Sequence, residues 1–269
     1  MKFMKRVAAC LVLALLMSSV YVQGASTVPY QKIEYGKNLK ANGWTFCDTD
    51  AGIAYQKGDK KYNIQCNSAI TNGATIYFTK TRSDYDGFNL YKVKAGKTTS
   101  TKIASLKHGE GVVGCYGKDI YFTRHDVSYG CDWTYIHTYA YNTSTKKIRR
   151  VLKNVDGEGY GRYVFGQPNT GAAGMAMELK LYNGETKKAR VVTKKSMGYE
   201  RIGNYVYYTK VTSGSYGKYK VKVYKFKLGS KKNTLVSKKI FKVKYLESIK
   251  KTSITYTDWN GNKRTAKYK

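Results

Sequence analysis

Side chains that carry acid–base or metal chemistry are scarce in this chain. Its 269 residues include 17 acids against 49 bases, and only three histidines, His108, His125 and His137. His125, Asp126 and His137 would supply metal ligands if a loop brought them together, but their spacing matches no standard zinc site. The sequence therefore predicts neither a bound metal nor a cofactor.

Two acidic stretches look faintly like calcium loops, Asp48-x-Asp50-x-Gly52 and Asp84-x-Asp86-Gly87. Both lack the later Glu and the third acidic position, and tight turns explain them better, because Asp and Gly stabilise such turns. The chain has no Gly-x-Ser-x-Gly elbow and no phosphate loop, and nothing marks a pair of catalytic carboxylates. These observations favour a protein that is not an enzyme.

Aromatic and basic residues gather in variable segments that follow a recurring apolar strand, at 80–87, 124–133, 166–174 and 210–217. Aromatic rings among polar and basic groups suit stacking on sugar rings or a protein hot spot. The alternative is that the rings pack locally and stabilise their own loops. The candidate ligand-binding residues are Arg82, Tyr85, Phe88, His125, Tyr129, Trp133, Tyr216 and Trp259.

The recurring strand has the form Gly-x-x-(Ile/Val)-(Tyr/Phe). It begins at Gly73, Gly117, Gly161 and Gly203, at intervals of 44, 44 and 42 residues. A period of this size is typical of β-propeller blades, each built from four antiparallel strands. Apolar and polar residues alternate through most of the chain, which also predicts an all-β fold. The variable segments would then share one face of the ring.

Six blades are the expected count. Residues around Gly43 give a shortened match to the repeat and predict a compact first blade; five blades are the alternative, if that unit is a cap. The last unit lacks a fourth strand, and an open ring would expose a sheet edge. We expect the lead-in strand at 31–35 to pair there and close the ring.

The strand Gly-x-x-Ile-Tyr-Phe-Thr, followed by Leu90-Tyr91-Lys92-Val93 and a Thr-x-x-hydrophobic strand, resembles the six-bladed TolB-like propellers. In particular it is similar to an uncharacterised branch, a domain of unknown function found in secreted bacterial proteins. The likeness covers about residues 43–257, and the Gly-His and Trp-Asp marks of WD40 blades are missing. The resemblance implies a ring that often binds protein or glycan, and it supplies no catalytic residue.

Residues 1–26 have the pattern of a secretory signal peptide, with Lys2, Lys5 and Arg6 ahead of an apolar run at 7–17. That run is shorter than the roughly 20 residues that span a bilayer, and no later segment is apolar enough to span one. We therefore predict that residues 27–269 form a single propeller domain, secreted or held at the cell surface, and monomeric.

The formal net charge of the chain is +32. A field of this size favours an anionic partner, such as a surface polymer or an acidic glycan. The alternative is that lysines cover solvent faces and protect strand edges, and Lys218, Lys220 and Lys222 alternate with apolar residues as that requires. Predicted export, and the lack of a known nucleic-acid motif, argue against nucleic acid as the partner.

Four cysteines follow the predicted signal peptide: Cys47, Cys66, Cys115 and Cys131. An even number in an exported chain suggests two disulfides. Neighbours in sequence would pair Cys47 with Cys66 and Cys115 with Cys131. The strand pattern opposes the second pair, because it places Cys131 in a loop towards the other end of the blade, and a disulfide needs Cα atoms within about 7 Å. The pairing stays open.

Two classes of function follow from these observations. The first is a secreted, non-enzymatic propeller that binds a protein or an anionic cell-surface polymer or glycan through one loop face. The second is an extracellular glycan hydrolase or lyase with its site at the central channel. An enzyme should bring two carboxylates, or a histidine and a carboxylate, together at a pocket; a binding protein should expose aromatic and lysine side chains. A purely structural surface protein is a third class.

Overall fold

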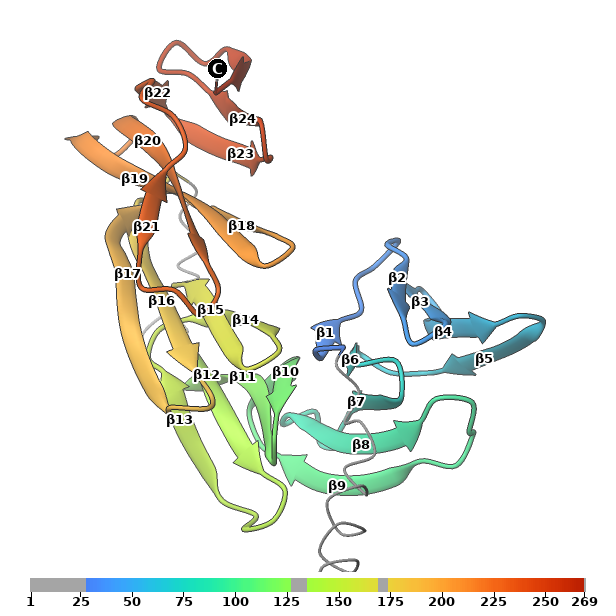
Figure 1. The fold of residues 1–269 in the computed structure, drawn as a ribbon. Coiled ribbons are helices and arrows are strands. Elements are labelled where there is room, and N and C mark those ends of the chain that lie inside the picture. Colours follow the sequence, from blue (N-terminus) through green and yellow to red (C-terminus); the bar gives the residue numbers. More distant parts are fainter. Residues whose placement is uncertain (1–27, 127–134, 169–173, 269) are drawn as a thin grey trace, which may run out of the picture.

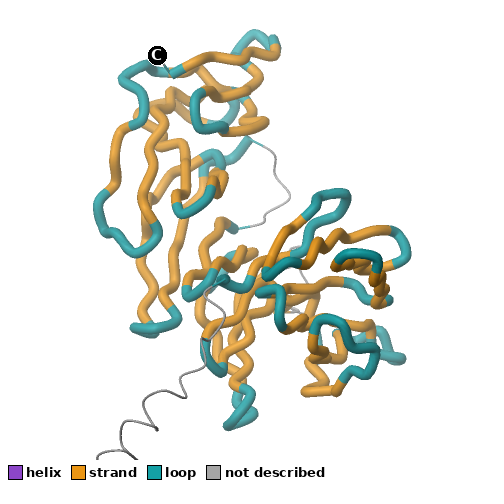
Figure 2. The backbone as a smooth tube through the Cα atoms, turned by 45° about the vertical axis from the view of Figure 1, so that its right-hand side comes forward, coloured by secondary structure: helices purple, strands orange, loops and turns teal. Residues whose placement is uncertain are grey.

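The structure, a computed structural model, describes residues 28–126, 135–168 and 174–268. In these ranges the chain forms 25 strands, and it has no helix long and apolar enough to cross a membrane. Figure 2 shows strands joined by loops throughout the molecule. The all-β class predicted from the sequence is confirmed. The predicted signal peptide, Tyr129 and Trp133 lie outside the described residues.

The described residues form six groups of antiparallel strands in chain order, and Figure 1 shows that the groups follow one another in an arc. We call each group a sheet, although a short strand described below joins the second and the fourth into one nine-stranded sheet. The first sheet contains β2 (Leu39–Ala41), β3 (Trp44–Thr49), β4 (Gly52–Lys57) and β5 (Lys60–Ile64). The second contains β6 (Ser68–Thr71), β7 (Thr75–Thr81), β8 (Phe88–Lys94) and β9 (Thr101–Leu106). The third contains β10 (Gly109–Tyr116), β11 (Asp119–Asp126), β12 (Tyr135–Asn142) and β13 (Ile148–Leu152).

The later sheets keep the same order of strands. The fourth contains β14 (Asp156–Tyr160), β15 (Tyr163–Gln167), β16 (Met177–Asn183) and β17 (Lys188–Ser196). The fifth contains β18 (Tyr199–Ile202), β19 (Tyr205–Ser215), β20 (Lys218–Lys227) and β21 (Asn233–Leu235), and β22 (Phe241–Val243) also pairs with β20. The sixth contains β23 (Tyr245–Ile249), β24 (Ser253–Thr257) and β25 (Lys263–Lys267).

Each glycine of the sequence repeat stands in the tight turn between the first and second strands of a sheet. Gly73, Gly117, Gly161 and Gly203 have φ values of +84°, +59°, +57° and +60°, in the left-handed region that favours glycine. The apolar residue three positions later is fully buried in every repeat: Ile76, Ile120, Val164 and Val206. The repeat therefore encodes a turn followed by the first core residue of the second strand.

The lead-in segment does not pair with the last sheet, so that expectation was wrong. β1 (Gln31–Lys32) lies between β6 and β14, where Gln31 stands opposite both Thr71 and Tyr160. In this position β1 supplies hydrogen-bond partners to the open backbone edges of two strands, β6 and β14. Pairing with the last sheet would supply partners to one edge only. Among the described residues, no strand pairing joins the first sheet to the last. The blade count therefore stays a prediction.

The fifth sheet is longer than the sequence suggests. The segment 210–217, expected to be a loop, is mostly strand, because β19 continues to Ser215 and pairs with β20 through a bulge between Val211 and Ser213. The strand β22 also pairs with β20 and extends this sheet, with Tyr219 opposite Val243 and Val221 opposite Phe241. The fifth sheet therefore contains a long β19–β20 hairpin, with β22 along the β20 edge.

Two first strands, β10 and β14, pack backbone to backbone. A Cβ added to Gly159 would lie 2.3 Å from the carbonyl oxygen of Val113 and 2.6 Å from the Cα of Gly114. Glycine in a strand marks such close approach of another backbone. With β1 beside β14, backbone fills this part of the centre of the array.

The structure contradicts the predicted disulfides, since Cys47, Cys66 and Cys115 are free thiols. Cys47 lies on β3 and Cys66 follows β5, with β4 between these two strands. Two strand spacings of about 4.8 Å exceed the reach of a disulfide. Cys115 is buried in the core beside Val112, whereas Cys131 belongs to the connection after β11, outside the described residues.

Thiol labelling checks this assignment. Burial raises the pKa of Cys66 from 9.0 to about 11 and that of Cys115 to about 12. At pH 8, a rise of two pKa units leaves about 100-fold less reactive thiolate. We expect iodoacetamide to modify both residues slowly in the folded chain and rapidly after unfolding, as measured by mass spectrometry. A disulfide-linked peptide containing either residue would contradict the assignment.

Candidate functional site

In these sheets the second and third strands are joined on the side where the chain also passes to the next sheet. We call this side the loop face; among the described residues it carries 82–87, 174–176 and 216–217. The first strand of each following sheet begins there. Residues in these connections and at the starts of first strands therefore converge on the loop face.

The connection 82–87 presents an exposed aromatic ring. Arg82 donates from Nε and Nη2 to the carboxylate of Asp84 at 2.9 and 2.5 Å, and its backbone N–H donates to Gly87 O at 3.2 Å. Hydrogen bonding from Arg82 holds the pKa of Asp84 well below its usual value. Tyr85, at φ +56°, is 86% exposed at the tip. The contacts of Arg82 thus stabilise the loop, and the exposed ring of Tyr85 is accessible for stacking on a ligand.

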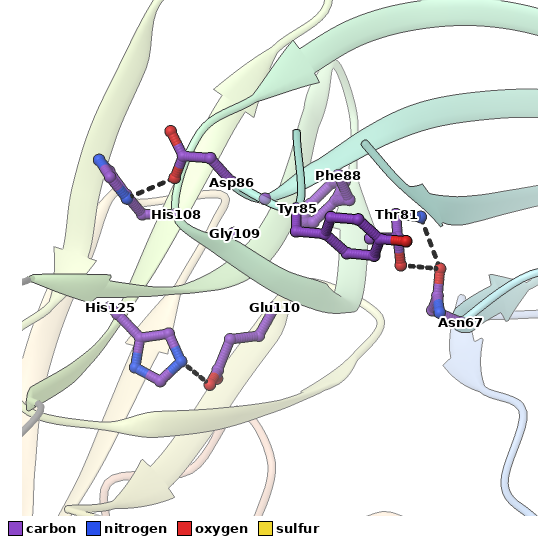
Figure 3. A pocket seen from close by; sticks show the side chains of 10 residues that line it. Asn67, Thr81, Tyr85, Asp86, Phe88, His108, Gly109, Glu110 and His125 are labelled. Carbon is purple, nitrogen blue, oxygen red and sulfur yellow. Dashed lines mark hydrogen bonds and ion pairs between the residues drawn. The ribbon is translucent and has the colours of Figure 1, made fainter. Parts of the chain in front are cut away.

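Tyr85 lies at the edge of a pocket of about 490 Å³ between the second and third sheets, which we call the loop-face pocket. Asn67 forms its far wall in Figure 3, where Oδ1 accepts hydrogen bonds from the backbone N–H and the hydroxyl of Thr81 at 2.7 and 3.1 Å. Polar groups around one exposed ring suit a ligand rich in hydroxyl groups.

Two histidine–carboxylate pairs form the other wall of the loop-face pocket (Figure 3). His108 Nδ1 lies 2.7 Å from Asp86 Oδ1, and His125 Nε2 pairs with Glu110 Oε1. Burial raises the pKa of Glu110, the charge of His125 opposes that rise, and Asp156 adds to it. A carboxyl group beside a histidine is also the arrangement of an acid–base pair.

The first strands bring carboxylates to the centre of the loop face. Glu110 is the second residue of β10, Asp156 and Glu158 are the first and third of β14, and Glu200 is the second of β18. Burial raises the pKa of Glu158, although Arg201 Nε donates to its carboxylate at 3.1 Å and opposes the rise. Lys32 and Lys37 likewise oppose the rise that burial gives to the pKa of Asp156 and of Glu200, so cations accompany these carboxylates.

Lysines cover one side of the fifth sheet near the loop face. Lys210 on β19 stands opposite Lys222 on β20, and Lys220 stands opposite Lys242 on β22. Directly paired residues, and residues two apart on one strand, point to the same side of a sheet. We call these four residues the lysine face. The sequence 201–246 has no Asp or Glu at all, so neither β19, β20 nor β22 offers them a carboxylate.

One of the candidate aromatic residues contacts the lysine face, and another lies at the tip of the hairpin that carries it. Tyr216 is 61% exposed at the tip of the β19–β20 hairpin. Trp259 donates from Nε1 to Tyr219 O at 3.2 Å, and Lys242 Nζ lies 5.3 Å from its ring centroid. Trp259 is thus anchored to β20, and it contacts one of the four lysines.

No group of three metal-ligating side chains occurs in the part of the chain that the structure describes. His125 stands opposite Ile136 and His137 stands opposite Arg124 in the β11–β12 register. The two histidines therefore point to opposite sides of the sheet. His137 is buried, and its Nδ1 accepts a hydrogen bond from the Asn154 N–H at 3.2 Å.

Neither the known protein families nor the sequences of curated proteins give a match to this chain. Among solved structures it is similar to Pyrococcus horikoshii acylaminoacyl peptidase, with a TM-score of 0.51 at 10% identity over 86% of this chain and 45% of that one. A structure from a study of two prolyl endopeptidases gives 0.46 at 11% identity over 89% and 50%. TolB from Acinetobacter baumannii gives 0.42 at 14% identity over 90% and 64%.

The chain spans about half the length of the two peptidase structures. The likeness to the acylaminoacyl peptidase concerns the fold alone. That fold likeness agrees with the succession of antiparallel sheets, most of them four-stranded, in which β1 joins the first strands β6 and β14. The chain is a β-propeller.

The propeller brings three of the candidate residues together, since Tyr85, Phe88 and His125 all line the loop-face pocket. Phe88 does so from the core, because it is 2% exposed and packs edge-on against Phe122 at 5.9 Å. Arg82 braces the loop that carries Tyr85. Contact of the candidate residues with a ligand stays a prediction.

Among the residues that line the loop-face pocket of the propeller, the candidate list lacks three with ionisable side chains: Asp86, His108 and Glu110. His108 and Glu110 flank Gly109 where the chain enters a new sheet, and that crossing lies on the same face as the variable segments. The position of the crossing was therefore a usable signal. The absence of acids from 201–246 was another, visible in the sequence itself.

Proposed function

We propose that this chain is a secreted, TolB-like propeller without enzymatic activity that binds an anionic cell-surface glycan through its loop face. The lysine face carries the proposal. Like charges placed directly opposite each other destabilise a sheet, and Lys210–Lys222 and Lys220–Lys242 are two such pairs. A bound polymer with repeated carboxylate or phosphate groups would neutralise both pairs.

The surroundings of the lysine face support a glycan as the polymer. The Trp259 ring lies against Lys242, and Tyr216 is exposed at the tip of the hairpin that carries three of the four lysines. Such rings suit stacking on sugars. At the centre of the loop face the carboxylates of Glu158 and Glu200 have the cations Arg201 and Lys37 as partners. The lysines of the fifth sheet, whose stretch 201–246 contains no acid, would therefore attract an anionic chain more strongly, while the loop-face pocket would hold uncharged sugar units.

Salt dependence tests the proposal. We expect the chain to bind alginate, a linear polymer of uronic acids, and not neutral dextran. The affinity for alginate should fall about tenfold or more between roughly 0.05 and 0.5 M salt, because the screening length shortens several-fold. Affinity can be measured by biolayer interferometry. Equal binding to both polymers, or binding that does not change with salt, would reject the charge mechanism.

A second candidate function is a glycan hydrolase or lyase, and the pair formed by Glu110 and His125 favours it. Both side chains line the loop-face pocket, and the pKa of Glu110 is raised by burial. In that case Glu110 would serve as the general acid or base.

Glu110→Gln separates the two functions. If the pocket is catalytic, the variant should release glycan products at least about 100-fold more slowly than the wild type, the low end of a general acid's contribution. Reducing-end release and absorbance of unsaturated products would report the two reaction types. Our binding proposal expects no product release from either protein, with alginate binding unchanged by the substitution.

A further inference from the structure

A second cavity lies at the opposite end of β20 from the lysine face. It has a volume of about 550 Å³ and lies between the β16–β17 turn of the fourth sheet and the β20–β21 turn of the fifth. We call it the turn pocket. Leu181 and the ring of Tyr163 supply apolar surface, while Lys188, Arg190 and Lys231 supply three positive charges. None of its ten lining residues is Asp or Glu.

Arg190 is the central charge of the turn pocket. It is half-buried, its Nη2 donates to Ser230 O at 3.1 Å, and its guanidinium carbon lies 5.3 Å from the ring centroid of Phe226. These contacts fix the plane of the guanidinium group. Burial lowers the pKa of Arg190, and the influence that opposes this is a tyrosine, Tyr208, and not a carboxylate.

The nearest acid on the adjoining turn is already paired. Glu185 binds Arg162 Nη1 and does not line the cavity. Arg162 also donates from Nε to the hydroxyl oxygen of Tyr163 at 2.8 Å, which leaves the Tyr163 hydroxyl proton to be donated elsewhere. A partly buried cation without a counter-charge costs free energy that an anionic ligand would offset.

We propose that the turn pocket binds a small organic anion, such as an acidic or phosphorylated monosaccharide, whose anionic group pairs with Arg190. The fork of N–H groups on a guanidinium matches both carboxylate and phosphate oxygens. Lys188 and Lys231 would hold the remaining negative charge, and the Tyr163 ring and Leu181 would contact the carbon skeleton. This site shares no residue with the lysine face, and the two proposals are independent.

Isothermal titration calorimetry on the full chain tests the turn pocket with three probes: glucuronate, glucose 6-phosphate and uncharged glucose. We expect at least one of the anions to bind and glucose not to bind. The anion that binds more tightly shows whether the turn pocket prefers a carboxylate or a phosphate. Binding of neither anion, or equal binding of glucose, would overturn the proposal.

Variants then locate the site. Arg190→Gln should weaken anion binding about tenfold or more, since it removes a charge-assisted hydrogen bond. Because Arg190 also packs on Phe226, the double variant Lys188→Gln/Lys231→Gln provides an independent test with little risk to folding, and it should weaken binding about 3- to 10-fold. Lys232→Gln, one residue outside the lining, is the matched control and should bind like the wild type.

If anion binding weakens in the double variant while alginate binding is unchanged, the turn pocket is a distinct anion site. Wild-type anion binding in the double variant and in folded Arg190→Gln would place the anion elsewhere and overturn the proposal. Loss of anion binding in a lysine-face variant, with the turn pocket intact, would also overturn it.

Discussion

Gly159→Ala is expected to lower the free energy of unfolding by about 2–3 kcal/mol, as overpacking of a tight core does. The added methyl group would lie 2.3 Å from the carbonyl oxygen of Val113 and 2.6 Å from the Cα of Gly114. Both of these atoms belong to the backbone, so they cannot move aside as a flexible side chain would. β10 and β14 would have to separate, which would also strain the pairing of β1 with β14. The melting temperature should fall by roughly 5–10 °C, measured by circular dichroism.

Gly203→Asn is the matched control for this change. Gly203 has φ +60° and no heavy atom within 4 Å of an added Cβ, and Asn adopts left-handed backbone more readily than most residues. The control should lose less than about 1 kcal/mol. A melting temperature for Gly159→Ala that matches the wild type would show that the first strands do not pack as closely as described.

Replacing all four lysines of the lysine face with Gln should weaken alginate binding roughly 10- to 100-fold, given up to about 1 kcal/mol for each cation near an anionic surface. The same variant should be at least as stable as the wild type, because it removes two pairs of opposed charges. If these lysines only kept the protein soluble, their replacement would not weaken alginate binding. Biolayer interferometry and thermal melting report the two quantities.

A control with the same loss of charge separates position from net charge. The exposed lysines Lys40, Lys60, Lys61 and Lys94 lie on the first two sheets. Their replacement by Gln also removes four positive charges, and alginate binding should fall less than about threefold through the long-range field alone. Equal losses in the two quadruple variants would mean that net charge, and not the lysine face, drives binding.

Local features of this fold were predictable from the sequence. The turn glycines, such as Gly73 and Gly117, and the buried residues three positions later follow from the repeat, because a left-handed turn and a core position each require particular residue types. The connection at 82–87 and its exposed Tyr85 were predictable in the same way.

Features that depend on which strands become neighbours were not predictable. β1 pairs with strands whose residues lie about 40 and 130 positions away in the chain, and its choice depends on the edges left open by the whole array. The separation of Cys47 from Cys66 depends on β4 lying between them. The opposition of Lys220 and Lys242 depends on β22 joining the fifth sheet.

Lysine acetylation in the presence and absence of alginate tests the central claim most directly. The claim is that the lysine face holds the polymer, and mass spectrometry can follow each lysine separately. We predict that bound alginate protects Lys210, Lys220, Lys222 and Lys242 and leaves Lys60 and Lys61 on the first sheet equally reactive. Protection spread evenly over all lysines, or confined to sheets other than the fifth, would contradict the account.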